Sequence, residues 1–227
     1  MHLDHELADL KDTLLTMASH TEHAVKQAIN ALENRDYDLA LRVRSNDALI
    51  DEFEVAVDET AIRLLAKAPL ARDLRFTAVA MKISQNLERV GDEAAKIASR
   101  ARDLSEEPPL KLQVDMPGLA DQVLHMLKNA LDAFVERDPT AARALIPQDK
   151  QVDALNKQIY RQLVMEMSQK PETIHRCLDL MVAAKSLERI ADHAKNMAEE
   201  VVFLCEAEDI RHGGRHRAAL FHHDTTP

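Results

Sequence analysis

The chain has 227 residues, of which 3% are aromatic and four are glycine, and it carries a formal net charge of −10 at pH 7. The shortage of aromatic residues and glycine excludes a turn-rich β-sandwich or barrel. The negative charge, with basic residues interleaved among the acids, disfavours binding to nucleic acid. We therefore expect a helical protein with no nucleic-acid partner.

Helical periodicity divides the first half of the chain into three long segments. Apolar residues recur at helical spacing over residues 7–34 and predict the first helix. A second helix is expected over residues 37–67, because Asp36 is a suitable N-cap. Pro69 then opens a third helix, over about residues 70–103.

The same plan begins again after a segment rich in helix breakers, Ser-Glu-Glu-Pro-Pro-Leu at residues 105–110. A fourth helix is expected over residues 117–136, and a fifth begins at Asp138-Pro139 as N-cap and first helical residue. A sixth is expected over residues 171–208. The second half therefore repeats the order of the first.

The two halves also align residue by residue. Arg35-Asp36 reappears as Arg137-Asp138 at an offset of 102, and LERVGD at residues 87–92 reappears as LERIAD at residues 187–192 at an offset of 100. Internal repeats of this kind determine the fold class. The sequence predicts an all-α fold of two tandem three-helix bundles related by duplication.

The domain boundaries follow from the same alignment. We expect the first bundle over residues 1–104, a linker over residues 105–115 and the second bundle over residues 116–210. The histidine-rich segment over residues 211–227 is typical of a disordered tail, and we assign it no site.

The N-terminal sequence and the cysteines bear on where the protein resides. The start MHLDHELADL carries acids where a secretory signal would have a basic segment and an apolar run. No segment approaches the about 18 apolar residues that a membrane-spanning helix needs. Cys177 and Cys205 fit no close-spaced metal pattern, and we read them as buried, reduced thiols. We expect a cytoplasmic protein.

Acidic residues at i, i+4 spacing are the main candidates for a functional site. This spacing places both carboxylates on one helix face, where they repel by roughly 0.2–0.5 kcal/mol. Any single pair is explained as a solvated acidic face, but the pairs fall at matching places in both halves. Clustered carboxylates need cations, and their hard oxygens suit Mg²⁺, Mn²⁺, Ca²⁺ or iron, with zinc possible. The pairs are Asp47/Asp51, Glu88/Asp92, Asp149/Asp153 and Glu188/Asp192.

Residues beside these pairs refine the expectation. Gly91, and the small Ala191 at the matching place, allow close approach of helices. Pro147 should kink the fifth helix just before Asp149. His193 lies on a different helix face from the glutamate of its segment, so we expect it beside the ligands or exposed, and not as a ligand.

The two matching segments carry a resemblance to a known family. PLARDLR at residues 69–75 with NLERVGD at residues 86–92 resembles the signature of the first repeat of the PhoU family. LERIADHA at residues 187–194, with Asn196, resembles the second signature, and residues 208–212 resemble the closing segment of the family. The similarity spans about residues 5–212.

Membership in this family implies two three-helix bundles that bind multinuclear clusters of iron, zinc, magnesium or manganese through the acidic pairs. It implies a homodimer without catalytic residues that represses the phosphate-starvation response when phosphate is plentiful. Its partners would be the phosphate-sensing histidine kinase and the ATPase subunit of the high-affinity phosphate transporter, so that it would reach the membrane only through them. The implied ligands are Asp47, Asp51, Glu88 and Asp92 for the first cluster and Asp149, Asp153, Glu188 and Asp192 for the second.

This chain departs from the family pattern at three positions. Glu93 stands where the family usually has His, Lys96 where it often has Asn, and Ala191 where Gly is common. We expect an additional carboxylate and amine near the first cluster, and hence two unequal metal sites.

Two other functions stay open on the sequence alone. Metal held by the carboxylates could activate water, which would make the chain a hydrolase or oxidase, although no general acid or base is evident beside the pairs. Alternatively, the carboxylates are only a solvated surface, and the chain is an inert helical scaffold.

Overall fold

The computed structural model describes residues 2–67 and 70–211, and within these ranges the chain forms helices and no strand. The all-α prediction is confirmed. No helix in this part of the chain is long and apolar enough to cross a membrane. Pro69 and the predicted tail beyond Arg211 lie outside the described residues. The elements are α1 (His2–Asn34), α2 (Tyr37–Ser45), α3 (Asp47–Lys67), α4 (Ala71–Glu106), α5 (Met116–Glu136), α6 (Pro139–Leu145), the 3₁₀ turn η1 (Ile146–Gln148), α7 (Asp149–Gln169), the 3₁₀ turn η2 (Pro171–Thr173) and α8 (Ile174–Glu206).

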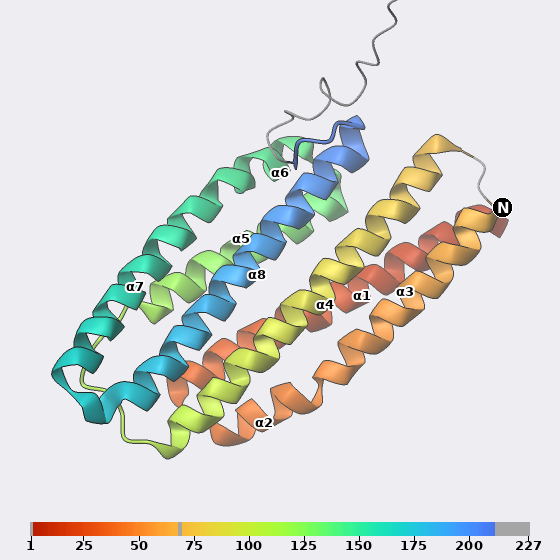
Figure 1. The fold of residues 1–227 in the computed structure, drawn as a ribbon. Helices are drawn as coiled ribbons and strands as arrows, with labels where there is room; N and C mark the ends of the chain where they lie inside the picture. The colour runs from red at the N-terminus through yellow and green to blue at the C-terminus, as the bar shows by residue number, and fades with distance from the viewer. Residues whose placement is uncertain (1, 68–69, 212–227) are drawn as a thin grey trace, which may run out of the picture.

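The two halves lie side by side, with α4 and α8 adjacent at the centre and α3 and α7 at the outer edges (Figure 1). Lys82 and Arg100 of α4 form ion pairs with Glu200 and Asp179 of α8, respectively. The residue number of the partner on α8 falls as the residue number on α4 rises, so the two helices run antiparallel. One contiguous apolar core includes buried residues from both halves, and the division into units over residues 1–104 and 116–210 stays a prediction.

The junctions after α1 and α5 are built alike. Arg35 and Arg137 adopt left-handed φ values of 56° and 53°, which end the helices. Asp36 and Asp138 then act as N-caps, each accepting hydrogen bonds from backbone N–H groups of the following helix. Both predicted N-caps are confirmed, and the 102-residue offset holds in the backbone geometry.

The prediction of one continuous second helix is wrong for the first half. The first half breaks at Asn46, whose N–H donates to the carbonyl oxygens of Arg42 and Val43 as α2 ends. Ser45 Oγ donates to the same Arg42 carbonyl, at 2.9 Å, and so competes with the backbone helix bond. In the second half the break falls at η1, where Pro147 interrupts the helix as expected. The two halves therefore kink at the same place by different means.

Other boundaries differ slightly from expectation. The helix α4 continues to Glu106, beyond the expected end at Asp103. Cys177 is buried as predicted, whereas Cys205 is only partly buried and donates its thiol hydrogen to the Arg137 carbonyl oxygen at 3.4 Å. Both described cysteines are free of disulfides.

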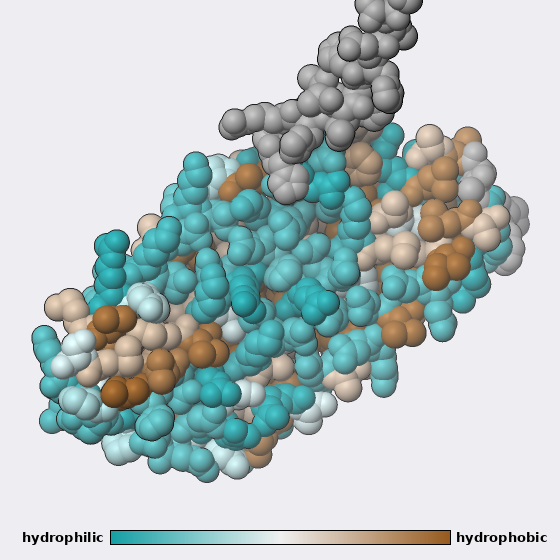
Figure 2. Space-filling view, in the orientation of Figure 1, coloured by the Kyte–Doolittle hydropathy of each residue, from teal (hydrophilic) through white to brown (hydrophobic). Residues whose placement is uncertain are grey.

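The surface over α4 and α8 is hydrophilic in the view of Figure 2. Hydrophobic areas appear at opposite ends of the same view, where α7 meets α8 and where α4 begins. The exposed apolar residues at these two ends include Ile174, Leu178, Leu70 and Leu74.

Gly91 allows α3 to approach α4 closely. A Cβ placed on Gly91 would lie 2.9 Å from Ile50 Cδ1 and 3.5 Å from Asp47 Oδ1. In the second half the matching pair is Ala191 and Val152, both buried. The added methyl group of alanine is therefore matched by the missing methylene of valine, which explains why Gly is not required there.

This packing predicts that the effect of Gly91→Ala depends on residue 50. Alanine gains roughly 1 kcal/mol of helix propensity, but overpacking against Ile50 costs about 1–3 kcal/mol. We expect Gly91→Ala alone to lower the free energy of unfolding by about 1 kcal/mol. In the Ile50→Val background, the same change should raise it by about 1 kcal/mol. Urea unfolding of the four proteins measures both effects, and an equal effect in both backgrounds would contradict this packing.

Candidate metal centre

The first-half acids lie on two adjacent helices, with Asp47 and Asp51 on α3 and Glu88 and Asp92 on α4. Burial raises the pKa of Asp47, and the negative charges of Asp51 and Asp92 raise it further. Burial also raises the pKa of Glu88, with a further contribution from Asp92. The structure thus brings both pairs of this half into one group of interacting charges.

The second half repeats this arrangement with Asp149 and Asp153 on α7 and Glu188 and Asp192 on α8. Burial raises the pKa of Asp192, and the charges of Asp149, Glu188 and Asp153 add to this effect, while Lys195 opposes it. All eight predicted residues therefore form two clusters, one between α3 and α4 and one between α7 and α8. We call these the first and the second acidic cluster.

The kinks in the second helix of each half place an acid at a helix start. Asp47 is the first residue of α3, and Asp149 is the first residue of α7. Backbone N–H groups of a first turn are unpaired within the helix and carry partial positive charge, which favours a carboxylate. The breaks at Asn46 and at Pro147 therefore each fall just before an acid of one cluster.

The donor atoms suit a cation, although they are not arranged around one. Glu88 Oε2 and Asp149 Oδ1 are buried and accept no hydrogen bond from the described residues. Arg89 Nε lies 3.3 Å from Glu88 Oε2 without hydrogen-bond geometry. Within residues 2–67 and 70–211, no group of three or more His, Cys, Asp or Glu side chains is positioned to hold a metal ion. The carboxylates thus fit a hard cation in chemistry, but loading one requires side chains to move.

Sequence reasoning missed one member of the first cluster, Glu54. Its pKa is raised by burial and by Asp58, and the charges of Asp51 and Asp92 also act on it. It lies three residues after Asp51 on the same face of α3, a spacing that could have identified it. The matching residue in the second half is Asn156, whose side-chain amide donates to Glu188 Oε2 at 3.4 Å.

Glu93 takes a different place from the expected one. It is buried between α4 and α8, where Lys96 Nζ donates to its Oε1 at 2.9 Å and Arg189 Nη1 at 3.1 Å. Burial alone would raise its pKa, but hydrogen bonds from Ser186, Lys96 and Arg189 lower it overall. Glu93 is therefore part of the contact between the halves and is neutralised there.

His193 makes the counterpart of the Glu93 contact. Its Nδ1 lies 2.9 Å from Asn86 Oδ1 across the same helix pair, and the matching contact joins Glu93 to Ser186. Burial lowers the pKa of His193, which favours the neutral imidazole. The expectation that it stands beside the ligands stays a prediction, and its hydrogen bond directs it towards α4.

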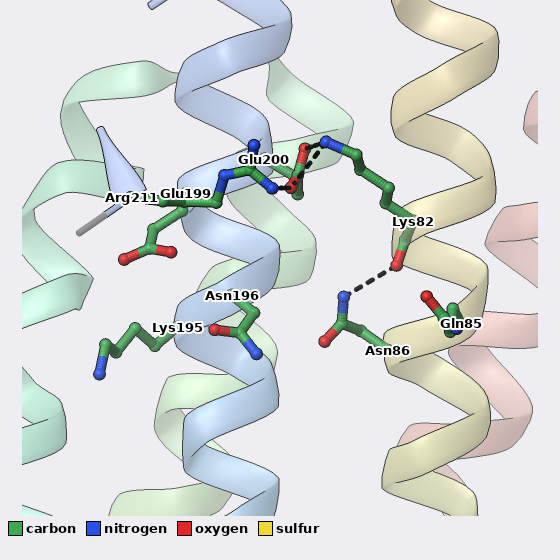
Figure 3. A pocket seen from close by; sticks show the side chains of 8 residues that line it. All are labelled: Lys82, Gln85, Asn86, Lys195, Asn196, Glu199, Glu200 and Arg211. Atoms are coloured by element: carbon green, nitrogen blue, oxygen red, sulfur yellow. Dashed lines mark hydrogen bonds and ion pairs between the residues drawn. The ribbon is translucent and has the colours of Figure 1, made fainter. Parts of the chain in front are cut away.

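Two polar cavities follow the line where α4 meets α8. One, of about 420 Å³, is bordered by Asp92 and Asp192 together with the Glu93 network. The other, of about 690 Å³, lies towards the C-terminal end of α8 (Figure 3). There Lys82 and Arg211 both pair with the buried Glu200. Both cavities are therefore lined by charges that already compensate one another.

Comparison with known proteins identifies the family. A family model described as the PhoU domain matches residues 14–101 and again residues 116–201, which confirms the tandem duplication. Two curated relatives are 41% and 36% identical to this chain. Each alignment covers 92% of this chain and 87% of the relative. They are the phosphate-specific transport system accessory protein PhoU homolog of Pseudomonas aeruginosa and the PhoU protein of Escherichia coli K12.

Solved structures agree. The crystal structure of PhoU from Pseudomonas aeruginosa has a TM-score of 0.88 at 40% identity, covering 90% of this chain and 99% of that one. The phosphate transport system regulatory protein PhoU from Streptococcus pneumoniae has a TM-score of 0.84 at 27% identity, covering 91% and 98%. Since the family model matches both repeats and the fold is shared throughout, this chain belongs to the PhoU family.

Proposed function

We propose that this chain is the accessory protein of a phosphate-specific transport system and a negative regulator of the phosphate-starvation response. The observation that carries this proposal is the match to curated accessory proteins over more than nine tenths of the chain. The protein acts by contact and performs no reaction of its own. Its partners are the phosphate-sensing histidine kinase and the ATPase subunit of the phosphate transporter, which it meets in the cytoplasm as a homodimer.

Metal binding is the second part of the proposal. The eight carboxylates of the two clusters would hold iron, zinc, magnesium or manganese, with Glu54 contributing to the first cluster. A bound cation supplies the positive charge that clustered carboxylates lack. The buried Glu88 Oε2 and Asp149 Oδ1, which accept no hydrogen bond from the described residues, support this proposal.

A role as a hydrolase is supported less well. The cations nearest the clusters already form ion pairs: Arg89 with Glu88, Lys185 with Glu188 and Lys195 with Asp149. These cations are thus engaged as counter-ions of the cluster acids, whereas a general acid or base must be available to a substrate. The arrangement therefore favours a metal that maintains structure over one that activates water.

A strain without this protein should express alkaline phosphatase in phosphate-rich medium at the level of phosphate-starved cells. Loss of the contact would leave the kinase in its activating state whatever the phosphate supply. Reporter activity in high and low phosphate, with and without the wild-type gene on a plasmid, measures this. Repression that persists in the deletion strain would contradict the regulatory role.

Protein purified without a histidine tag should contain on the order of one metal ion or more per chain, measured by elemental analysis. Added Mn²⁺ at about 100 times its dissociation constant should stabilise the fold by about 2.7 kcal/mol. Replacing Asp47, Asp51, Glu88 and Asp92 together by their amides should remove the contribution of the first cluster.

The matched control is Asp132→Asn, which neutralises an exposed acid on α5. It should leave metal content and stabilisation unchanged. Metal content well below one per chain, with no stabilisation by Mn²⁺, would instead favour the inert scaffold.

A further inference from the structure

The two acidic clusters differ at a position that the family motifs do not include. Lys195 follows Asp192 by three residues on α8, and the matching residue on α4 is Ala95. One cluster therefore has an ammonium group within its own helix where the other has a methyl group.

Lys195 points into the second cluster. Its Nζ donates to Asp149 Oδ2 at 2.7 Å, and its side chain is only 30% exposed. Figure 3 shows Lys195 directed away from α4, towards the side of α8 on which α7 lies. The charged hydrogen bond therefore joins the two helices that carry the second cluster.

The first cluster has a looser set of cations. Arg89 Nε lies 3.3 Å from Glu88 Oε2 and its Nη1 3.6 Å from Asp92 Oδ2, with the side chain 56% exposed. Lys96 donates to Glu93 in the contact between the halves, and acts on Asp47 only at longer range. Exposed ion pairs of this kind contribute little, whereas a half-buried charged hydrogen bond is stronger.

The number of acidic residues also differs between the two clusters. The first cluster has Glu54 in addition to its two pairs, and the second has the neutral Asn156 at that place. Lys185, which is about as exposed as Arg89, forms an ion pair with Glu188 in the second cluster. The first cluster is therefore richer in acids and poorer in internal cations.

We propose that Lys195 is an internal counter-ion that competes with metal at the second cluster, so that the first cluster binds divalent cations more tightly. This rests on the proposed metal sites and names the residue that makes them unequal. A cation loaded into the second cluster meets the Lys195 ammonium, which already occupies Asp149 Oδ2. Affinity for hard cations follows the charge of the available ligands, and this contact balances the charge of one of them.

Titration calorimetry with Mn²⁺ on the full chain tests this. A background with Asp47→Asn and Asp51→Asn isolates the second cluster, and there Lys195→Met should tighten Mn²⁺ binding by about tenfold or more. A background with Asp149→Asn and Asp153→Asn isolates the first cluster, and there Ala95→Lys should weaken binding by a similar factor. Lys128→Met removes one exposed positive charge from α5 and should leave both affinities unchanged.

The outcomes separate this inference from the proposed function. Mn²⁺ affinity of the second cluster that does not change on Lys195→Met would overturn the counter-ion role and leave metal binding intact. An equal gain with Lys128→Met would also overturn it, because net charge alone would then explain the change. Absence of Mn²⁺ binding in all variants that remain helical by circular dichroism would overturn the metal sites themselves.

Discussion

The antiparallel packing of α4 against α8 is the contact on which the rest of the molecule depends. Each of the two is the longest helix of its half, and each carries one acidic pair of its cluster. Ion pairs run along the length of this contact, from Lys82 with Glu200 to Arg100 with Asp179. The ion pair between Glu93 Oε1 and Arg189 Nη1, at 3.1 Å, fixes the register of α4 on α8. Both acidic clusters are thereby attached to one structural contact, and Asp92 and Asp192 border the same cavity along it.

Charge repulsion sets the second constraint. The pKa values of Asp47, Glu88 and Asp192 lie above their ordinary values, first because of burial and then because of neighbouring acids. A group with a raised folded-state pKa stabilises the fold below its unfolded pKa and loses that contribution as the pH rises through its folded pKa. These acids therefore weaken the fold at neutral pH. In the second cluster the ammonium of Lys195 offsets part of this repulsion, and the remaining repulsion favours bound cations.

Local sequence patterns were sufficient for the features that depend on one helix at a time. Helical periodicity, the N-caps and the repeated acidic spacing predicted the fold class and eight residues of the two clusters, although not Glu54. Contacts between the halves were not predictable, because the register of α4 on α8 depends on packing over the whole length of both helices. Glu93 was therefore expected beside the first cluster, whereas its carboxylate pairs with Arg189 of the other half. The kink at Asn46 was also missed, since no proline marks it and side-chain competition from Ser45 is a weak signal.

Duplication explains why the halves can share geometry and differ in chemistry. Gly91 with Ile50 and Ala191 with Val152 stand at matching places in the two halves, and the second pair exchanges a methylene of Ile50 for the methyl group of Ala191. No such compensation preserves charge, because the ammonium of Lys195 enters only the second cluster. Packing constrains the sum of volumes at a contact, whereas electrostatics only requires that charge be balanced by some cation. A cluster that balances part of its charge internally depends less on an external ion, and on the metal sites that we propose this is the cluster that contains Lys195.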